Sequence, residues 1–327
     1  MATQYIEKFL STASIPRSTP TAQGVGAVGG QLFLDGGQPV GGPFNKAQYW
    51  FVDAANGSTV ALGRGGSGWS DALSTVAAVF GSAQAAGGDP IADRYFRSGD
   101  VILIAGKVQE QLTAPVQVFD VTVVGICNRP RHADATPAGG NYAASTWAAP
   151  ASPTALTPLL KVMQQGWRFV NILFVGPSDA ASVLLFRDGG SGDDERDASH
   201  AEFHNCRFAS GQDGIEDSGA CGHVGVYDSY FTDMTGVALK QTTGAGIGQP
   251  YFRWDVQRNR FQDCPSLTTA KAAQFFRFMW NTVSFAGAVT LGFDFTGGKQ
   301  NQIVQNVFNV LAADFDPPPG MTHDALQ

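Results

Sequence analysis

The chain has 327 residues, a formal net charge of −7, only 15% charged residues, 40 glycines and 23 phenylalanines. Its length can bury a large core, and its aromatic content excludes a disordered chain. The acidic balance and the lack of any basic run exclude nucleic-acid binding through phosphate neutralisation. The first ten residues contain no apolar signal-peptide core and no stretch approaches 18 apolar residues, so we expect neither a signal peptide nor a membrane span.

Residues 1–45 have the composition of an arm. The segment 18–30 is rich in Gly, Pro, Ser and Thr and shows no helical or strand period, and apolar residues such as Tyr5 and Phe9 could dock on another surface. Gly24–Gly29 matches the spacing of a dinucleotide-binding loop, but no strand precedes it and no helix follows it, so we expect no nucleotide there. We predict an extended N-terminal arm that becomes ordered on binding a partner.

Residues 46–98 predict a strand followed by a helix. Residues 49–53 form a short apolar run that ends before the turn signal Asn56-Gly57. Ser70 could cap a helix that ends no later than Gly87-Gly88, and its apolar stripe would be Leu73, Val76, Ala77 and Phe80. We expect this helix to cover the open end of a stack of strands.

Residues 99–310 predict strands. A short strand lies between Gly99 and Gly106, two strands and a bend fill 116–125, and the Ala-, Pro- and Thr-rich segment 129–158 is expected to be a loop. Around Trp254 and Val256 apolar and polar residues alternate, which is typical of a half-buried strand. Residues 311–327 contain three consecutive prolines and are expected to be a tail.

A phrase recurs in the second half of the chain: an apolar strand, then Asn or Asp, then an apolar residue, mostly Phe, two or three positions later. The pairs are Asn171 and Phe174, Asn205 and Phe208, Asp228 and Phe231, Asn259 and Phe261, Asn281 and Val283, and Asn306 and Phe308. Irregular repeats of this length built from short strands predict a solenoid, here an all-β parallel β-helix. We expect the Asn and Phe residues to stack from coil to coil inside it.

Carboxylates between 210 and 225 form the most tempting catalytic motif. Asp213, Glu216 and Asp217 precede Cys221-Gly-His223, and β-helical polygalacturonases carry an Asp-Asp pair followed by Gly-His-Gly. Here Gly214 and Val224 occupy decisive positions of that pattern. We therefore predict no catalytic, cofactor-binding or metal-binding residue.

Four weaker patterns support the same prediction. The acidic run 188–197 could hold calcium but lacks the EF-hand spacing, and we expect a solvated loop. Lys240, Arg253 and Arg258 could supply the base of a lyase, but solvent-facing strand positions are the simpler interpretation. His200 and His204 have no third ligand for a metal. The cysteines, Cys127, Cys206, Cys221 and Cys264, have no metal or redox spacing and are expected to be buried and reduced.

Residues 49–57, the helix near 70–80, and the strands 99–106 and 121–125 resemble the opening of right-handed β-helix proteins of the pectin-lyase-like class. They resemble especially those that tailed bacteriophages encode as virion proteins. The resemblance covers about residues 49–310 and implies a right-handed solenoid with an N-terminal cap helix and an extended arm. The same opening occurs in carbohydrate-active enzymes, so it is more specific for the fold than for a virion.

The resemblance implies two functions. The first is a non-enzymatic structural protein of the virion, a capsid decoration or cement protein that is anchored by its arm, assembled in the host cytoplasm and commonly trimeric. Its partners would be the major capsid protein or other virion proteins. The alternative is a tailspike-like depolymerase or glycan-binding protein that uses Asp213, Glu216 or Asp217 on a surface glycan. The short chain and the missing acid/base set favour the first.

Overall fold

The computed structural model describes residues 32–33, 39–40, 47–58, 65–126, 145–187, 196–219, 221–242, 253–270, 275–284, 291–294 and 301–309. Within the predicted arm, β1 (Leu32–Phe33) and β2 (Pro39–Val40) pair antiparallel. The rest of 1–46, including Gly24–Gly29, and the tail 311–327 lie outside the described residues.

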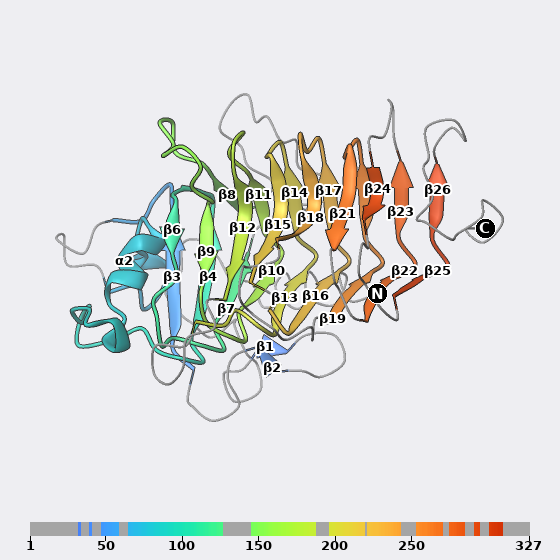
Figure 1. Ribbon diagram of the computed structural model, residues 1–327. Coiled ribbons are helices and arrows are strands. Elements are labelled where there is room, and N and C mark those ends of the chain that lie inside the picture. Colours follow the sequence, from blue (N-terminus) through green and yellow to red (C-terminus); the bar gives the residue numbers. More distant parts are fainter. Residues whose placement is uncertain are drawn as a thin grey trace.

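The chain forms a parallel β-helix, as the sequence predicts. Each complete coil contributes one strand to each of three sheets, whereas the first described coil contributes only β3 and the last only β25 and β26. The neighbour of a strand in space is the equivalent strand of the next coil, and the three sheets are the sides of one prism (Figure 1). All pairings within the three sheets are parallel. We call them the nine-stranded, the eight-stranded and the seven-stranded sheet.

The strands have these bounds. The nine-stranded sheet contains β3 (Tyr49–Asp53), β4 (Val101–Ala105), β7 (Thr122–Gly125), β10 (Arg168–Val170), β13 (Ala201–His204), β16 (His223–Tyr227), β19 (Arg253–Gln257), β22 (Phe276–Met279) and β25 (Gln302–Val304). The eight-stranded sheet contains β5 (Lys107–Gln109), β8 (Thr146–Ala148), β11 (Leu173–Val175), β14 (Arg207–Ala209), β17 (Tyr230–Thr232), β20 (Arg260–Gln262), β23 (Thr282–Ser284) and β26 (Val307–Asn309). The seven-stranded sheet contains β6 (Leu112–Thr113), β9 (Leu160–Val162), β12 (Ala181–Phe186), β15 (Asp213–Ser218), β18 (Val237–Thr242), β21 (Ser266–Ala270) and β24 (Leu291–Asp294).

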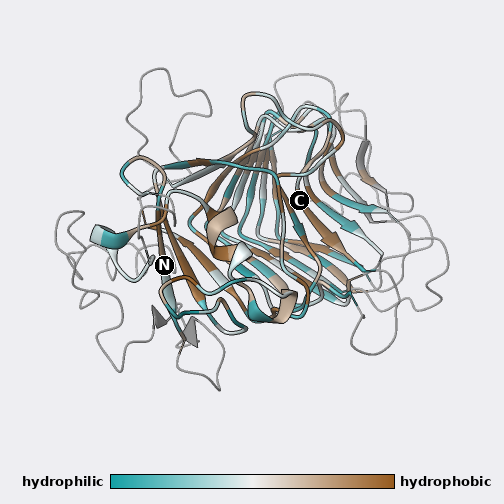
Figure 2. Ribbon diagram, turned by 90° about the vertical axis from the view of Figure 1, so that its left-hand side faces the viewer, coloured by the Kyte–Doolittle hydropathy of each residue, from teal (hydrophilic) through white to brown (hydrophobic). Residues whose placement is uncertain are grey.

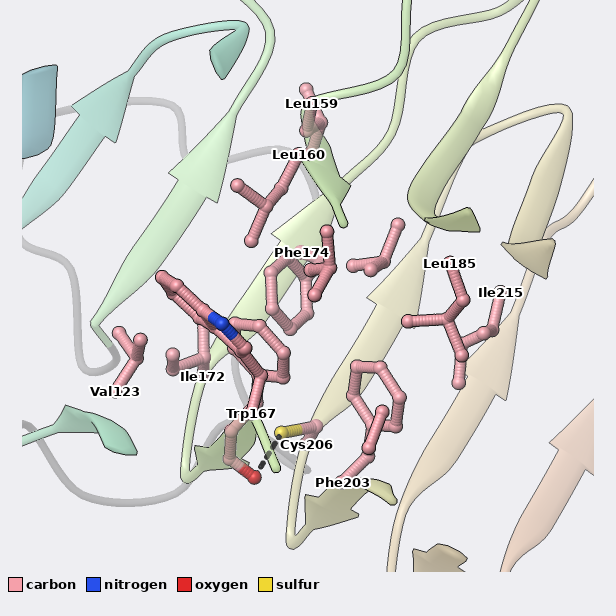
Figure 3. Packing of buried hydrophobic residues seen from close by; sticks show 14 of the residues in the cluster. Val123, Leu159, Leu160, Trp167, Ile172, Phe174, Leu185, Phe203, Cys206 and Ile215 are labelled. Carbon is pink, nitrogen blue, oxygen red and sulfur yellow. Dashed lines mark hydrogen bonds between the residues drawn. The ribbon is translucent and has the colours of Figure 1, made fainter. Parts of the chain in front are cut away.

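The core is a column of stacked side chains inside the prism. In the eight-stranded sheet Phe174, Phe208, Phe231 and Phe261 are in register, fully buried and nearly parallel, with ring centroids 4.6–5.0 Å apart. Phe174, Phe203 from the nine-stranded sheet and Leu185 from the seven-stranded sheet belong to one buried cluster and are labelled in Figure 3. The predicted Phe stack is confirmed, and it sets the register of the coils.

From β10 onward, a two-residue corner joins the nine-stranded sheet to the eight-stranded sheet in each coil. Its first residue has a left-handed backbone, with φ between 51° and 59°, in all six coils from β10 onward. That residue is Asn171, Asn205, Asp228, Arg258, Trp280 or Gln305. Among non-glycine residues Asn and Asp adopt this conformation most readily. The sharp turn is therefore imposed by the coil geometry, because in the last three coils other residues adopt it as well.

The predicted Asn stack is confirmed, but it consists of two stacks rather than one. In early coils Asn occupies the first corner position, and Asn205 Nδ2 donates to Asn171 Oδ1 at 3.0 Å. In later coils Asn occupies the second position, where the backbone N–H groups of Asn259 and Asn281 donate to the side chains of Asn281 and Asn306. This shift explains why the spacing from Asn to the apolar residue falls from three residues to two.

The cap helix starts later than the sequence predicts. Its regular part, α2, spans Val76–Gly81 and is capped by Thr75 rather than Ser70. Residues 69–71 form a single 3₁₀ turn, and Leu73 runs extended because its backbone bridges to Val52 and Ser58. A second 3₁₀ turn follows at Gln84–Ala86.

The predicted role of α2 as a lid is confirmed. Phe80 packs edge-on against Trp167, with ring centroids 5.8 Å apart, and Val76 and Val79 are fully buried in the main core, whereas Ala77 is exposed. Glu110, just after β5, accepts the N–H groups of Val76 and Ala77. Viewed from the N-terminal end, α2 lies across the opening of the prism (Figure 2).

The loop predicted over 129–158 and the two strands predicted over 116–125 are both wrong in part. Within 129–158, Thr146–Ala148 is β8, and Trp147 is fully buried in register with Phe174. The sequence did not predict this strand because the surrounding segment is rich in Ala and Thr and has the composition of a loop. Only one strand, β7, occupies 116–125, since Gln117 and Asp120 have left-handed backbones that turn the chain.

Cys206, Cys221 and Cys264 are buried and unbridged, as predicted, while Cys127 lies outside the described residues. The Cys206 thiol lies among core side chains (Figure 3) and donates to the backbone oxygen of Phe169 at 3.4 Å. In the part of the chain that is described, no helix is long and apolar enough to cross a bilayer.

Candidate functional site

The three carboxylates predicted as the alternative catalytic set lie on β15 but face different environments. Glu216 points to solvent, whereas Asp213 and Asp217 are buried. Lys240 on the next coil lies between Asp213 and Glu216. Its Nζ is 2.8 Å from Asp213 Oδ2 and 3.5 Å from Glu216 Oε2. Burial alone would lower the pKa of Lys240, but its bonds and charge contacts with both carboxylates raise it. The ammonium is therefore held positive and offsets one of the two negative charges of Asp213 and Glu216.

Asp217 is sealed inside the solenoid. Its Oδ1 accepts the backbone N–H of Cys221 at 3.0 Å, and the amide of Gln241 lies 3.5 Å from Oδ2. Burial raises the pKa of Asp217 to about 6. The side chain has no solvent-exposed surface, so it cannot touch a substrate outside the prism.

The His that resembled the second half of the polygalacturonase pattern lies on another face. His223 belongs to the nine-stranded sheet, where its Nε2 is 3.2 Å from Asp255, whereas Asp213 bonds Lys240 at the seven-stranded sheet. The two halves of the motif are therefore not brought together.

Lys240, Arg253 and Arg258 do not converge either. Arg253 lies on the outer face of the nine-stranded sheet, 2.9 Å from Asp255. Arg258 lies at the two-residue corner, where both its Nε and Nη2 bind the carboxylate of Asp228. These pairs occupy separate positions on the prism.

The structure does assemble a cluster that the sequence analysis missed, on the outer face of the nine-stranded sheet. Glu202, Gly225 and Asp255 occupy one outward column in successive coils. Two coil spacings therefore separate the backbones of the two acidic residues, roughly 9–10 Å. Basic side chains surround both. Arg168 and His204 contact Glu202, at 3.4 and 3.1 Å, and His223, Arg253 and Arg277 contact Asp255, at 3.2, 2.9 and 3.5 Å.

The ring of Tyr227 fills the centre of this cluster. A Cβ on Gly225 would lie 2.4 Å from Cε2 of Tyr227 and 2.8 Å from its hydroxyl oxygen, so the absence of a side chain lets the ring lie back over the strand. The ring also stacks on His204, with centroids 5.0 Å apart. Burial first, and then the charges of Asp255 and Glu202, raise the pKa of Tyr227 to about 12.

The electrostatics of the cluster determine what it can do. Burial alone would raise the pKa of Glu202, but the bond to His204 and the charge of Arg168 hold it below its usual value. The pKa of Asp255 is likewise lowered by His223 and Arg253 against the effect of burial. Glycoside hydrolysis needs one carboxylic acid that stays protonated near neutral pH. Both carboxylates here are held ionised, so the arrangement suits binding better than acid catalysis.

The possible metal ligands do not gather. The ring of His200 lies against His223, with centroids 5.7 Å apart, and His204 bonds Glu202. Among the described residues no group of three His, Cys, Asp or Glu side chains is placed to hold a metal ion. Most of the acidic run, residues 188–195, lies outside the described part, and Asp197 at its end pairs with Arg187 at 3.7 Å.

Comparisons with protein-family models, with curated proteins and with solved structures gave no match.

The cluster on the nine-stranded sheet could have been found only with the coil register in hand. On β16 the buried Val224 and Val226 point inward. The residues that alternate with them, His223, Gly225 and Tyr227, therefore face outward. That these residues meet residues of β13 and β19 depends on where each coil closes, and coil length varies too much to infer this directly.

Proposed function

We propose that the chain is a non-enzymatic structural protein of a bacteriophage virion that decorates or cements the capsid and is anchored through residues 1–45. The observation that carries the proposal is electrostatic. The partly exposed carboxylates Glu202 and Glu216 and the nearly buried Asp255 each pair with a Lys or Arg side chain. Asp217, whose pKa burial raises to about 6, is closed off from solvent. Such a surface supports a rigid, assembled body.

The phage origin rests on the resemblance of residues 49–125 to virion β-helices, and the anchor on the composition of 1–45. The partners are the major capsid protein or other virion proteins, and the assembly is a homotrimer, since a cyclic trimer suits a three-fold position of a capsid.

The test is a deletion. Protein lacking residues 1–45 should keep the strand signal of the β-helix in far-ultraviolet circular dichroism but should no longer be incorporated into particles. Normal incorporation of the truncated chain would exclude the anchoring role. A folded truncated chain is the control, because misfolding would also prevent incorporation.

A second candidate is a tailspike-like depolymerase or glycan-binding protein, and the cluster around Tyr227 is the observation that favours it. Aromatic rings flanked by ionic groups are suited to sugars. Purified protein incubated with a panel of polysaccharides and assayed for new reducing ends or unsaturated uronates would detect cleavage. Our main proposal expects none. Cleavage that disappears in Tyr227→Phe or Glu202→Gln would establish the second candidate instead.

A further inference from the structure

The outer face of the nine-stranded sheet has an excess of positive charge from β19 to β25. The outward residues of its last three strands alternate with the inward core residues and are Arg253, Asp255, Gln257, Arg277, Met279, Gln302 and Val304. They include two arginines, one aspartate and no other charged side chain. In a chain with a net charge of −7, these positions form a local basic patch. We call Arg253, Asp255 and Arg277 the arginine patch.

Asp255 holds the two arginines of the patch next to each other. Arg253 lies two positions before it on β19, and Arg277 is its register neighbour on β22. The Nε of Arg253 is 2.9 Å from Oδ2 of Asp255, and the Nη1 of Arg277 is 3.5 Å from Oδ1. Asp255 itself is only 3% exposed, because the side chains that it holds enclose it. Both guanidinium groups are thus anchored at one buried point, which reduces the ordering that a ligand has to impose on them.

Most of the N–H donors of these two arginines are available to a ligand. A guanidinium group carries five such donors in a planar fork. The side chains of Arg253 and Arg277 are 50% and 40% exposed. Within the described residues, these side chains make no hydrogen bond or ion pair other than those with Asp255. One carboxylate cannot neutralise two guanidinium groups, so the patch retains a positive charge that faces solvent.

We propose that Arg253 and Arg277 form a binding site for an oxyanion, that is, a carboxylate, sulfate or phosphate group. The planar fork of a guanidinium group matches two oxygens of such a group, and this geometry distinguishes Arg from Lys. Asp255 lies beneath the two arginines and fixes them, and the ligand contacts their outer N–H groups. Gln302, the outward residue next to Arg277 on the following coil, adds an uncharged amide rather than a competing carboxylate.

The surroundings of the patch favour an oxyanion that belongs to a larger molecule, such as an acidic segment of a partner protein. A free ion on this open face stays hydrated, and exposed ion pairs contribute little in water. A larger ligand covers the contact and excludes water from it, which strengthens the attraction. Met279 and Val304 in the neighbouring outward column supply apolar surface for such a ligand, and Val304 is 43% exposed. The inference goes beyond the proposed function, since it does not depend on what the chain assembles on.

A nuclear magnetic resonance titration of the full-length protein tests the site. The arginine Nε–H signals are followed as sodium sulfate or, separately, a hexaglutamate peptide is added, with sodium chloride holding the ionic strength constant. The signals of Arg253 and Arg277 should shift saturably with both probes. Arg253→Gln and Arg277→Gln should each weaken binding about tenfold, followed on the signal of the remaining arginine, because each removes a charge-assisted contact. Arg260→Gln, at an exposed position of the eight-stranded sheet, is the matched control and should leave the affinity unchanged.

Far-ultraviolet circular dichroism checks that each variant is folded. Tighter binding of the peptide than of sulfate supports the site and assigns it to an acidic segment of a protein. Saturable binding of sulfate without tighter binding of the peptide also supports the site and assigns it to a free ion. Signals of Arg253 and Arg277 that shift no more than that of Arg260 overturn the inference, and so do affinities that neither substitution lowers.

Discussion

The carboxyl group of Asp217 is enclosed in the solenoid, and its burial makes the stability of the folded protein depend on pH. Its pKa is about 6 in the folded protein against an ordinary value of 3.8. The folded state therefore binds this proton more tightly than the unfolded chain. The stabilising contribution is complete below pH 4 and is lost as the pH rises through about 6.

Asp217→Asn should remove that dependence. At pH 8 we expect the variant to be more stable than the wild type by up to about 3 kcal/mol, from roughly two units of pKa, and the gain should vanish near pH 4. The new amide could also donate to Oε1 of Gln241, which is buried without a partner. Urea denaturation at both pH values measures this, with Asp233→Asn, an exposed change, as the control. A gain that is equal at both pH values would contradict the assignment.

Phe208 tests the aromatic column. It is fully buried between Phe174 and Phe231, with centroids 5.0 and 4.6 Å away. Phe208→Ala should lower the free energy of unfolding by about 3–5 kcal/mol, because it removes a large side chain from a column that cannot collapse. Phe119→Ala, at a site 42% exposed, should change it by less than about 1 kcal/mol. Similar losses in the two variants would show that the column is not a tight core.

At the scale of elements, the Asn stacks hold neighbouring coils together where the sheets turn. Oδ1 of Asn281 accepts the backbone and side-chain N–H groups of Asn259, at 2.8 and 3.1 Å, and its Nδ2 donates to the carbonyl of Val256 at 3.0 Å. One side chain thus satisfies three groups of the preceding coil that are closed off from water.

Asn281→Ala should therefore lower the free energy of unfolding more than a substitution at an exposed corner position does. Leaving buried polar groups without partners costs about 1–3 kcal/mol each, and we expect a total loss of roughly 3 kcal/mol or more. Gln305→Ala, at the exposed first position of the next corner, is the matched control and should cost less than about 1 kcal/mol. Chemical denaturation of both variants measures the difference, and equal losses would mean that the stack contributes little.

The sequence predicted the strands and the Phe column well because a period of two and a recurring large residue mark them directly. It predicted the cap helix only in outline. The stripe through Leu73 and Ala77 suggested one continuous helix, whereas backbone pairing of Leu73 with β3 draws that residue into an extended segment. Such pairing depends on contacts distant in sequence, which local propensity does not contain.

At the scale of the whole molecule, the three faces of the prism have different properties. The nine-stranded face carries the cluster around Tyr227, and the seven-stranded face carries the ion pairs of Lys240 with Asp213 and Glu216. The eight-stranded face carries Tyr230 between Arg207 and Arg260. None of this follows from composition, since the net charge of −7 hides how charges are distributed. Placing side chains on faces requires the register of every coil.

We propose that this chain is a structural component that assembles on a capsid. The most direct measurement is the number of copies bound when purified full-length protein is added to capsids made without it. The account predicts saturable binding at a fixed number of copies per capsid, and no binding by residues 46–327. Failure of the folded full-length chain to bind at any concentration would contradict it.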